Sequence, residues 1–299
     1  AKLAEAKKRF IFEELFLLQC GLLYYRDRIK EVRQGIKHGV DGKLVTAVKN
    51  SLPFELTEAQ QKAWQEISLD MQDNKPMHRL LQGDVGSGKT VVSALALAKT
   101  AENGYQGCIM VPTEILAQQH FETLTEYLGK QGLRVELLTS SVKKAKRREI
   151  LENLEQGEID VLVGTHALIQ EKVVYDNLAL VITDEQHRFG VAQREMFGSK
   201  GQLPHVLVMS ATPIPRTLAI VLYGDLEVSV LDEMPKNRLP IKNCVVDPSF
   251  RKKAYAFLEA QVEAGHQVYV ICPMVEAGED SADGLENVTD YTEKLKAAL

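Results

Sequence analysis

The chain has 299 residues, of which 45% are hydrophobic and 26% are charged. These fractions are close to globular averages and exclude a disordered tail, a collagen-like repeat and a disulfide scaffold. The formal net charge of −5 offers no overall argument for a nucleic-acid or membrane partner. At about 150 residues per domain, the length predicts roughly two domains.

Cysteine usage and hydropathy argue against a metal-binding cysteine site, a membrane-spanning protein and a secreted protein. The four cysteines form no C-x-x-C pair and have no histidine at metal-ligand spacing, which predicts free thiols in a reducing compartment. The most apolar stretch, residues 10–25, contains Glu13 and Glu14 and is shorter than the ~20 residues of a membrane span. No small-residue cleavage site follows it. We therefore expect a cytoplasmic protein without a membrane partner. A monomer is our separate expectation for its oligomeric state.

The chain divides into three segments by pattern. Residues 1–48 comprise a helix over 1–34, with apolar side chains at three- and four-residue steps, and a glycine-containing loop. This linker helix is expected to pack on a neighbouring domain. Residues 49–234 alternate between strands and helices, and residues 235–299 begin a second unit of the same kind. The predicted fold class is α/β.

Short apolar runs between helical patterns indicate a doubly wound parallel sheet. The strands are expected at 79–82, 108–111, 135–138, 161–163, 178–182 and 206–209, and the main helices at 89–102, 113–128 and 143–156. In the third segment we expect strands at 241–246 and 267–272 and helices at 250–263 and 288–299.

A glycine-rich run between a predicted strand and a predicted helix fits G-x-x-x-x-G-K-[ST] in full. In such a loop, backbone N–H groups and the helix N-terminus surround phosphate oxygens. We expect Lys89 to reach the β- and γ-phosphates of ATP and Thr90 to place its hydroxyl on Mg²⁺. The predicted nucleotide-binding residues are Gly83, Asp84, Val85, Gly86, Ser87, Gly88, Lys89 and Thr90.

An acidic pair follows the most apolar predicted strand. Ligands of a parallel sheet gather at the carboxyl ends of its strands, so Asp184 is predicted to bind the metal and Glu185 to orient the attacking water. The alternative is two solvated carboxylates at the start of a loop, which the phosphate loop disfavours. Ser210-Ala211-Thr212 ends the next strand and, taken alone, is an ordinary start of a helix.

Five segments in order, GDVGSGKT, VPTEILAQQH, VGTHALIQ, DEQHRFGV and SATPIPRTLA, resemble superfamily 2 helicases. Within that superfamily, DEQHRFGV and the run LPFELTEAQ are most similar to the RecG family of bacterial ATP-dependent DNA helicases. The sister family of transcription-repair coupling factors shares the TPIPRT pattern. The resemblance extends from about Arg9 to Leu299. It implies a RecA-like domain over 49–234 and the beginning of a second over 235–299.

The resemblance implies roles for residues around the nucleotide. Gln60 is at the position that reads the adenine edge, and Phe54 either packs against the base or is a core residue. Gln186 and His187 would act with Lys89 and the acidic pair and couple the nucleotide state to closure of the second domain.

The resemblance also implies contacts with DNA and a link between hydrolysis and DNA movement. Ser210 and Thr212 would form that link. Phosphate contacts that read no sequence are implied for Pro112, Thr113, Gly164, Thr165, His166 and Arg216. Two alternatives are a buried His166 and an interdomain Arg216.

A basic cluster stands apart from these motifs. It comprises Lys143, Lys144, Lys146, Arg147 and Arg148. The cluster is either the solvated first turns of a helix or a DNA contact. Basic side chains at a helix N-terminus oppose the helix dipole, which favours an external anion slightly.

The activity implied by the resemblance is an ATP-dependent DNA helicase or translocase that acts on branched DNA, such as stalled forks and Holliday junctions, in repair and recombination. Such motors also contain a wedge domain and a complete second RecA-like domain, which we do not recognise in these residues. We therefore expect ATP binding, slow hydrolysis and no unwinding. A coupling-factor-type double-stranded DNA translocase and a catalytically silent nucleotide- or DNA-binding module remain alternatives, and the motifs alone do not distinguish DNA from RNA.

Overall fold

The chain forms two compact units, Ala1–Arg238 and Leu239–Leu299. The computed structural model describes residues 2–32, 34–170, 172–184, 203–212, 226–233, 242–275 and 286–298.

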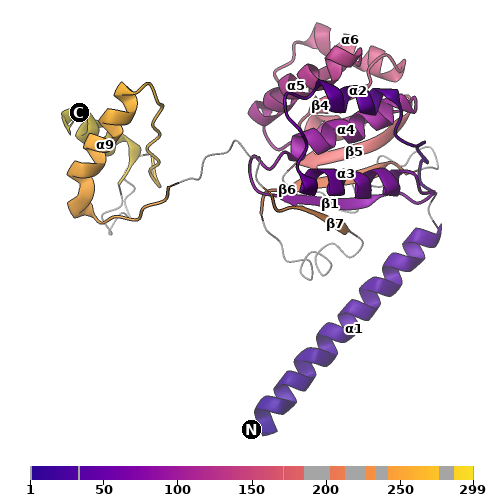
Figure 1. The fold of residues 1–299 in the computed structure, drawn as a ribbon, viewed down its shortest axis with the longest axis horizontal. Coiled ribbons are helices and arrows are strands. Elements are labelled where there is room, and N and C mark those ends of the chain that lie inside the picture. Colours follow the sequence, from indigo (N-terminus) through magenta and orange to yellow (C-terminus); the bar gives the residue numbers. More distant parts are fainter. Residues whose placement is uncertain are drawn as a thin grey trace. The chain divides into compact units, whose positions relative to one another are not determined.

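The first unit is built on a seven-stranded sheet in the order β3-β4-β2-β5-β6-β1-β7, in which every neighbouring pair is parallel (Figure 1). Its strands are β1 (His78–Gly83), β2 (Gln106–Met110), β3 (Val135–Leu138), β4 (Val161–Gly164), β5 (Leu178–Asp184), β6 (His205–Ser210) and β7 (Glu227–Leu231). The six predicted strands are confirmed. The edge strand β7 was not predicted, because Glu227 and Ser229 interrupt its apolar pattern.

Helices cover both faces of this sheet, which confirms the doubly wound α/β class. The helices of the first unit are α1 (Lys2–Val32), α2 (Lys43–Ser51), α3 (Glu58–Met71), α4 (Lys89–Glu102), α5 (Glu114–Leu128) and α6 (Lys144–Glu155). Helices α2 to α5 share one apolar cluster with the sheet, and α6 packs into a second cluster. The short 3₁₀ helices η1 (Gly129–Gln131) and η2 (His166–Ile169) complete the unit.

Two helices of the first unit were not predicted, although α3 carries a local signal. The Thr57 hydroxyl accepts from the backbone N–H of Gln60 at 3.2 Å, and the Gln60 side-chain oxygen accepts from the backbone N–H of Thr57 at 3.0 Å. This reciprocal pair is a capping box, which fixes the start of a helix. The predicted helix over 1–34 is confirmed as α1, where the apolar side chains of Phe10, Phe12 and Leu15 are exposed.

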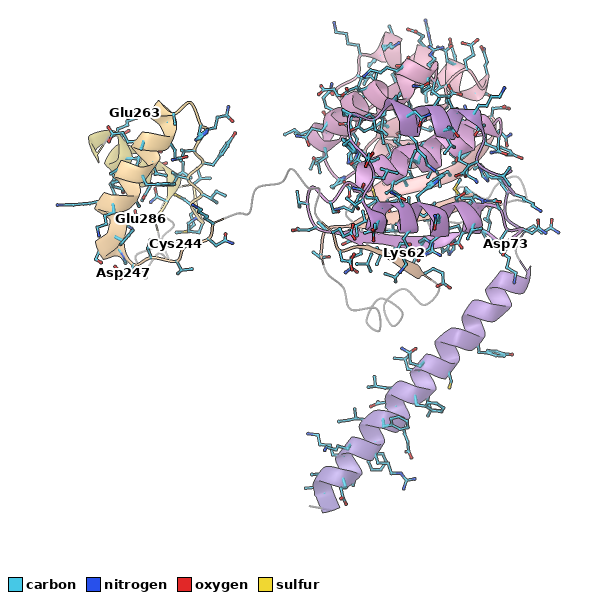
Figure 2. All side chains as sticks on the ribbon, in the orientation of Figure 1. Lys62, Asp73, Cys244, Asp247, Glu263 and Glu286 are labelled. Carbon is cyan, nitrogen blue, oxygen red and sulfur yellow. The ribbon has the colours of Figure 1, made fainter. Side chains whose placement is uncertain are left out.

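The second unit contains η3 (Pro248–Phe250), α9 (Arg251–Glu263) and α10 (Val288–Ala298), so both helices predicted there are confirmed. Glu286, labelled in Figure 2, forms ion pairs with Arg251 at 2.9 Å and with Lys294 at 2.8 Å. These pairs connect the start of α9 with α10. They are partly exposed to solvent, so each contributes little to stability.

The two strands predicted in the second unit are wrong. Residues 242–246 and 267–272 form no ladder, and the described part of the unit holds one isolated bridge, between Met274 and Asn287. A strand requires a hydrogen-bonded partner as well as an apolar sequence. Without one, Tyr269 and Ile271 are 82% and 92% exposed.

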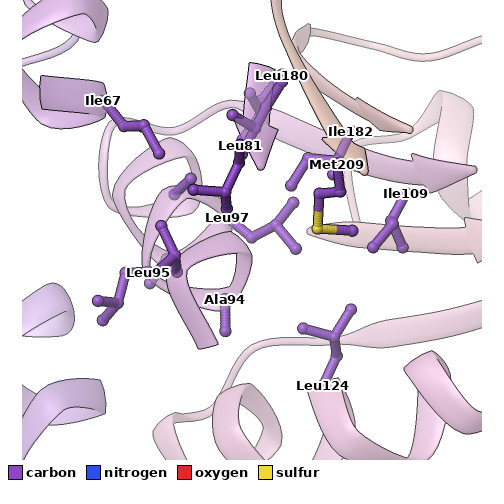
Figure 3. Packing of buried hydrophobic residues seen from close by; sticks show 14 of the residues in the cluster. Ile67, Leu81, Ala94, Leu95, Leu97, Ile109, Leu124, Leu180, Ile182 and Met209 are labelled. Carbon is purple, nitrogen blue, oxygen red and sulfur yellow. The ribbon is translucent and has the colours of Figure 1, made fainter. Parts of the chain in front are cut away.

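The core of the first unit follows the twofold periodicity of its strands. Leu81 of β1 and Ile182 of β5 face the cluster that contains Leu97 of α4 (Figure 3). Their neighbours Leu80 and Val181 belong to clusters on the opposite face. Each fully buried aliphatic side chain contributes about 1.5–3 kcal/mol, and this packing holds the carboxyl ends of the strands in place.

Two buried histidines connect the segment before α2 to the amino ends of β1 and β6 through hydrogen bonds and a contact between their rings. The rings of His38 and His205 lie 5.0 Å apart. His205 Nδ1 accepts from the Met77 N–H at 2.8 Å, so its Nε2–H donates to the Ile36 carbonyl at 2.6 Å. Burial lowers the pKa of His38 to about 4 and that of His205 to about 3. Both rings are therefore neutral in the folded protein.

This pair predicts a loss of stability in acid. The unfolded chain takes up protons at these histidines near pH 6.5, while the folded chain resists uptake until about pH 4 and 3. Their contribution to the free energy of unfolding is therefore complete above pH 6.5. Below pH 6.5 it falls as the pH decreases, by about 1.4 kcal/mol per pH unit for each histidine. Urea unfolding at several pH values measures this slope. His38→Gln should reduce it and the exposed His166→Gln should not; equal slopes in both would contradict the account.

Candidate nucleotide and DNA site

The phosphate loop connects β1 to α4. β1 ends at Gly83, and α4 begins at Lys89. Lys89 Nζ donates to the carbonyl oxygens of Gly83 at 2.6 Å and Asp84 at 3.1 Å. The ammonium group thus folds back over the loop, where it contacts these two carbonyl oxygens. A phosphate oxygen is a stronger acceptor and would replace them.

Glycines shape the loop for close approach of a ligand. Gly86 and Gly88 have φ angles of 79° and 90°, a region that side chains with a Cβ rarely adopt. A Cβ on Gly88 would collide with Gln60 Nε2, and one on Gly83 would lie 2.5 Å from Ser87 Oγ. The Ser87 hydroxyl is buried without a hydrogen-bond partner among the described residues. The loop is thus a cradle of backbone that fits a phosphate group.

Gln60 is bound to this loop. Its Nε2 donates to the Ser87 carbonyl at 2.7 Å, its Oε1 accepts from Thr57, and the residue is 2% exposed. The structure therefore brings Gln60 to the phosphate loop, while its contact with adenine stays a prediction. Phe54 is 44% exposed and lines a groove of about 960 Å³ together with Trp64. The alternative that Phe54 is a core residue is wrong.

Replacing Gly88 with alanine is predicted to damage nucleotide binding. The new Cβ adds backbone strain of about 1–2 kcal/mol and displaces Gln60, so we expect the affinity for ATP to fall roughly tenfold or more. Gly104→Ala is a matched control, because Gly104 has a φ of 79° but no heavy atom within 4 Å of its Cβ position. Titration with a fluorescent ATP analogue measures the affinity of both variants. Equal affinities would contradict the claim that the glycine backbone of the loop is shaped to bind phosphate.

The metal candidate Asp184 is the last residue of β5. β5, β6 and β1 are adjacent, with Asp184 opposite Met209 and Gln82 opposite Ser210. The backbone at the end of β5 thus lies about two strand spacings, roughly 10 Å, from the end of β1, where the phosphate loop begins. This separation suits Mg²⁺, which binds through one or two carboxylates, several waters and phosphate oxygens. The predicted residues Glu185, Gln186, His187 and Arg216 lie outside the described residues.

A histidine that was not predicted contacts this carboxylate. His120 Nε2 of α5 lies 2.9 Å from Asp184 Oδ2. Its neighbours one turn away, Ala117 and Leu124, are fully buried. A polar residue within an apolar helix face is the signal that could have singled out His120.

Ser210 and Thr212 form a local turn at the end of β6, between the acidic residue and the phosphate loop. Their hydroxyls lie 2.8 Å apart, and the Thr212 N–H donates to Ser210 Oγ at 3.2 Å. Ser210 is 6% exposed. The structure brings these residues to the same sheet edge as Asp184 and Lys89, and their coupling role stays a prediction.

Most of the predicted DNA contacts lie together on a neighbouring part of the sheet edge. Met110 of β2 is opposite Gly164 of β4, so Pro112–Thr113 and Gly164–Thr165 follow adjacent strands. Pro112, Thr113 and His166 are exposed, and the alternative of a buried His166 is therefore wrong.

The basic cluster belongs mainly to α6 and is partly neutralised there. Lys146 lies 3.2 Å from Glu149, and Arg148 lies 3.6 Å from Glu152. Arg147 donates to Gln170 at 3.1 Å. These contacts favour a solvated helix face over a preformed DNA contact.

The described residues hold neither a membrane span nor a metal cluster built from side chains. None of their helices is long and apolar enough to cross a membrane. Across the same residues, no group of three or more His, Cys, Asp or Glu side chains is arranged to hold a metal ion. A magnesium ion held largely by phosphate oxygens and water needs no such group.

Comparison with known proteins agrees with the geometry. The chain is 50% identical over 290 residues to "ATP-dependent DNA helicase RecG" of Bacillus subtilis, a match that covers 97% of this chain and 42% of the relative. The protein of the same name from Synechocystis is 48% identical, with coverage of 98% and 36%. A structure of RecG bound to a three-way DNA junction matches with 42% identity and a TM-score of 0.83, covering 99% of this chain and 38% of that one.

The chain therefore spans about two fifths of the length of the curated relatives it matches. The family model described as DEAD/DEAH box helicase matches residues 57–221, which is more than half of the chain and includes β1 through β6. On this evidence the chain belongs to the DEAD/DEAH box helicase family.

Proposed function

We propose that this chain is the nucleotide-binding motor part of an ATP-dependent DNA helicase that acts on branched DNA in bacterial repair and recombination. The observation that carries the proposal is the convergence of Lys89, Asp184 and Ser210 at the carboxyl ends of the adjacent strands β1, β5 and β6. Relatives named ATP-dependent DNA helicase RecG support the activity, and the RecG complex with a three-way junction supports branched DNA as the substrate. Such a substrate places the protein in the bacterial cytoplasm.

In this proposal the phosphate loop holds ATP. Lys89 leaves the carbonyls of Gly83 and Asp84 and donates to the β- and γ-phosphates, while loop N–H groups bind the remaining oxygens. Thr90 and Asp184 hold Mg²⁺, which when bound neutralises charge that develops on the phosphates. Glu185 orients the water. Gln60, bonded to Ser87, transmits the position of the base to the loop.

DNA binds in this proposal through phosphate contacts at the ends of β2 and β4. The exposed Thr113 and the half-buried Thr165 offer hydroxyls, and the first turn of α5 offers backbone N–H groups. Because such contacts read no bases, preference for a junction arises in parts of the relatives beyond the matched region. Gln186, His187, Ser210 and Thr212 couple hydrolysis to movement along the strand. Phe54, next to the capping box, packs against the base.

Domain roles follow from the same proposal. Residues 49–234 form a RecA-like domain that binds ATP, residues 235–299 begin a second RecA-like domain, and residues 1–48 link to a wedge. In a complete motor, an arginine from the second domain accelerates hydrolysis by ~10³-fold or more. We therefore expect this chain by itself to turn over ATP slowly and to leave DNA unwinding to the longer protein.

Steady-state ATP hydrolysis tests the proposal. The chain, an Asp184→Asn variant and a buffer blank are compared with no DNA, with linear duplex and with a synthetic four-way junction. We expect slow hydrolysis that DNA stimulates and that the variant lacks. Nucleotide binding with hydrolysis at the blank level under every DNA condition would instead identify a catalytically silent module.

A further inference from the structure

The buried histidine of helix α5, His120, contacts the proposed magnesium ligand Asp184. His120 and Asp184 are joined at 2.9 Å between Nε2 and Oδ2, and their side chains are 9% and 16% exposed. The ring lies among fully buried neighbours on its own helix, including Ala117 and Leu124. Burying an imidazole is costly unless it is hydrogen-bonded. A residue needed only for packing would be apolar at this position, so the hydrogen bond to Asp184 is the feature that needs an explanation.

The surroundings of the ring decide which nitrogen carries the proton. His120 Nδ1 is buried and has no hydrogen-bond partner among the described residues. A neutral ring protonated at Nδ1 would bring the Nε2 lone pair against a carboxylate oxygen, and two acceptors repel. A ring protonated at Nε2 donates to Asp184. His120 is therefore a donor to the carboxylate.

This donor engages one of the two carboxylate oxygens. In the described part of the chain, His120 is the hydrogen-bond partner of the Asp184 side chain, through Oδ2. A carboxylate held at one oxygen cannot rotate freely, and its second oxygen stays available to a cation. Histidine and carboxylate partners of this kind orient metal ligands in many proteins, and their loss costs about 10–100-fold in metal affinity.

We propose that His120 is a positioning residue that holds the Asp184 carboxylate in the orientation that binds Mg²⁺. The proposal rests on the function proposed above, because it takes Asp184 to be the magnesium ligand. His120 itself is too buried to touch the nucleotide, and it acts through Asp184. The same helix begins at Glu114, directly after the proposed DNA contact Thr113, so one rigid element supports both sites.

The test measures magnesium-dependent nucleotide binding rather than hydrolysis. A fluorescent ADP analogue is titrated in EDTA and over a range of Mg²⁺ concentrations. His120→Leu should raise the Mg²⁺ concentration for half-maximal enhancement about 10–100-fold and leave the affinity in EDTA unchanged. His120→Gln places an amide N–H near the position of Nε2, so its Mg²⁺ concentration for half-maximal enhancement should be close to that of the wild type. The buried-histidine control His38→Gln should lower thermal stability without changing the Mg²⁺ dependence.

Each outcome separates the two proposals. A His120→Leu protein with wild-type Mg²⁺ dependence, or a His120→Gln protein no better than His120→Leu, would overturn the positioning role and leave the proposed function intact. A wild-type chain that binds no nucleotide at any Mg²⁺ concentration would overturn both. If His120→Leu does not fold, His120→Asn, whose amide is one bond too short, takes its place with the same expected result.

Discussion

Lys89→Ala is expected to abolish nucleotide binding at concentrations that saturate the wild-type chain. The Lys89 ammonium lies within the phosphate loop, bonded at 2.6 Å and 3.1 Å to the carbonyls of Gly83 and Asp84. Each hydrogen bond to a charged group contributes about 1.5–3 kcal/mol, so losing two to the phosphates lowers affinity about 100-fold or more. The loop itself survives, because Gly83, Gly86 and Gly88 shape its backbone without the lysine.

Calorimetric titration with Mg²⁺ and a non-hydrolysable ATP analogue measures this loss. Lys62→Ala is the matched control, because Lys62 is an exposed lysine of α3 (Figure 2). It should bind nucleotide as the wild type does. An affinity for Lys89→Ala within about threefold of that of Lys62→Ala would show that the loop holds phosphate without its lysine, and the assignment of the site would fail.

The largest expected loss of stability comes from Asp41→Ala. Lys99 is a fully buried lysine whose Nζ donates to Asp41 Oδ1 and to Ser68 Oγ, each at 2.8 Å, and Trp64 Nε1 donates to Asp41 Oδ2 at 3.0 Å. Burial alone would raise the pKa of Asp41, but hydrogen bonds from Lys99 and Ser68 hold it below its ordinary value. Removing the carboxylate leaves a buried ammonium without a counter-ion. This costs about 3–5 kcal/mol.

Thermal unfolding measures this cost, which corresponds to a decrease in Tm on the order of 10 °C. Asp73→Ala is the control, because Asp73 is exposed (Figure 2) and its loss should change stability by less than about 1 kcal/mol. The double variant Asp41→Ala with Lys99→Met should regain most of the loss, since no charge then remains buried. Equal decreases in Asp41→Ala and in the double variant would contradict a charge effect.

The predicted parts of the fold are those whose local pattern matches their burial. Most of the strands from β1 to β6 are short apolar runs that are buried on both faces, as Leu80 and Leu81 show. β7 is different, because Ser229 is buried as the acceptor of a hydrogen bond from Arg79 at 2.8 Å. That partner is 150 residues away, and an isolated pattern does not show it. The segment 267–272 has the opposite mismatch, since its apolar residues have no ladder to join.

The site divides in the same way. Lys89 and Asp184 could be predicted, because a contiguous motif and the end of an apolar strand specify them. The contacts that His120 and Gln60 make at the site could not be predicted, because His120 reaches Asp184 from 64 residues away and Gln60 reaches the Ser87 carbonyl from 27 residues away. The exposure of Phe54 and His166 likewise depends on packing between elements. Motifs identify the reacting groups, and tertiary packing determines what holds them.

The coupling between nucleotide and DNA tests the account most directly. The affinity of a fluorescent ATP analogue is measured with and without a saturating four-way junction, and the affinity for the labelled junction is measured with and without saturating nucleotide. A motor domain must link the two sites, and the two ratios must then agree, with coupling of about 5-fold or more. We predict such a reciprocal change. A junction and a nucleotide that each bind without changing the affinity for the other would contradict a motor function for this chain.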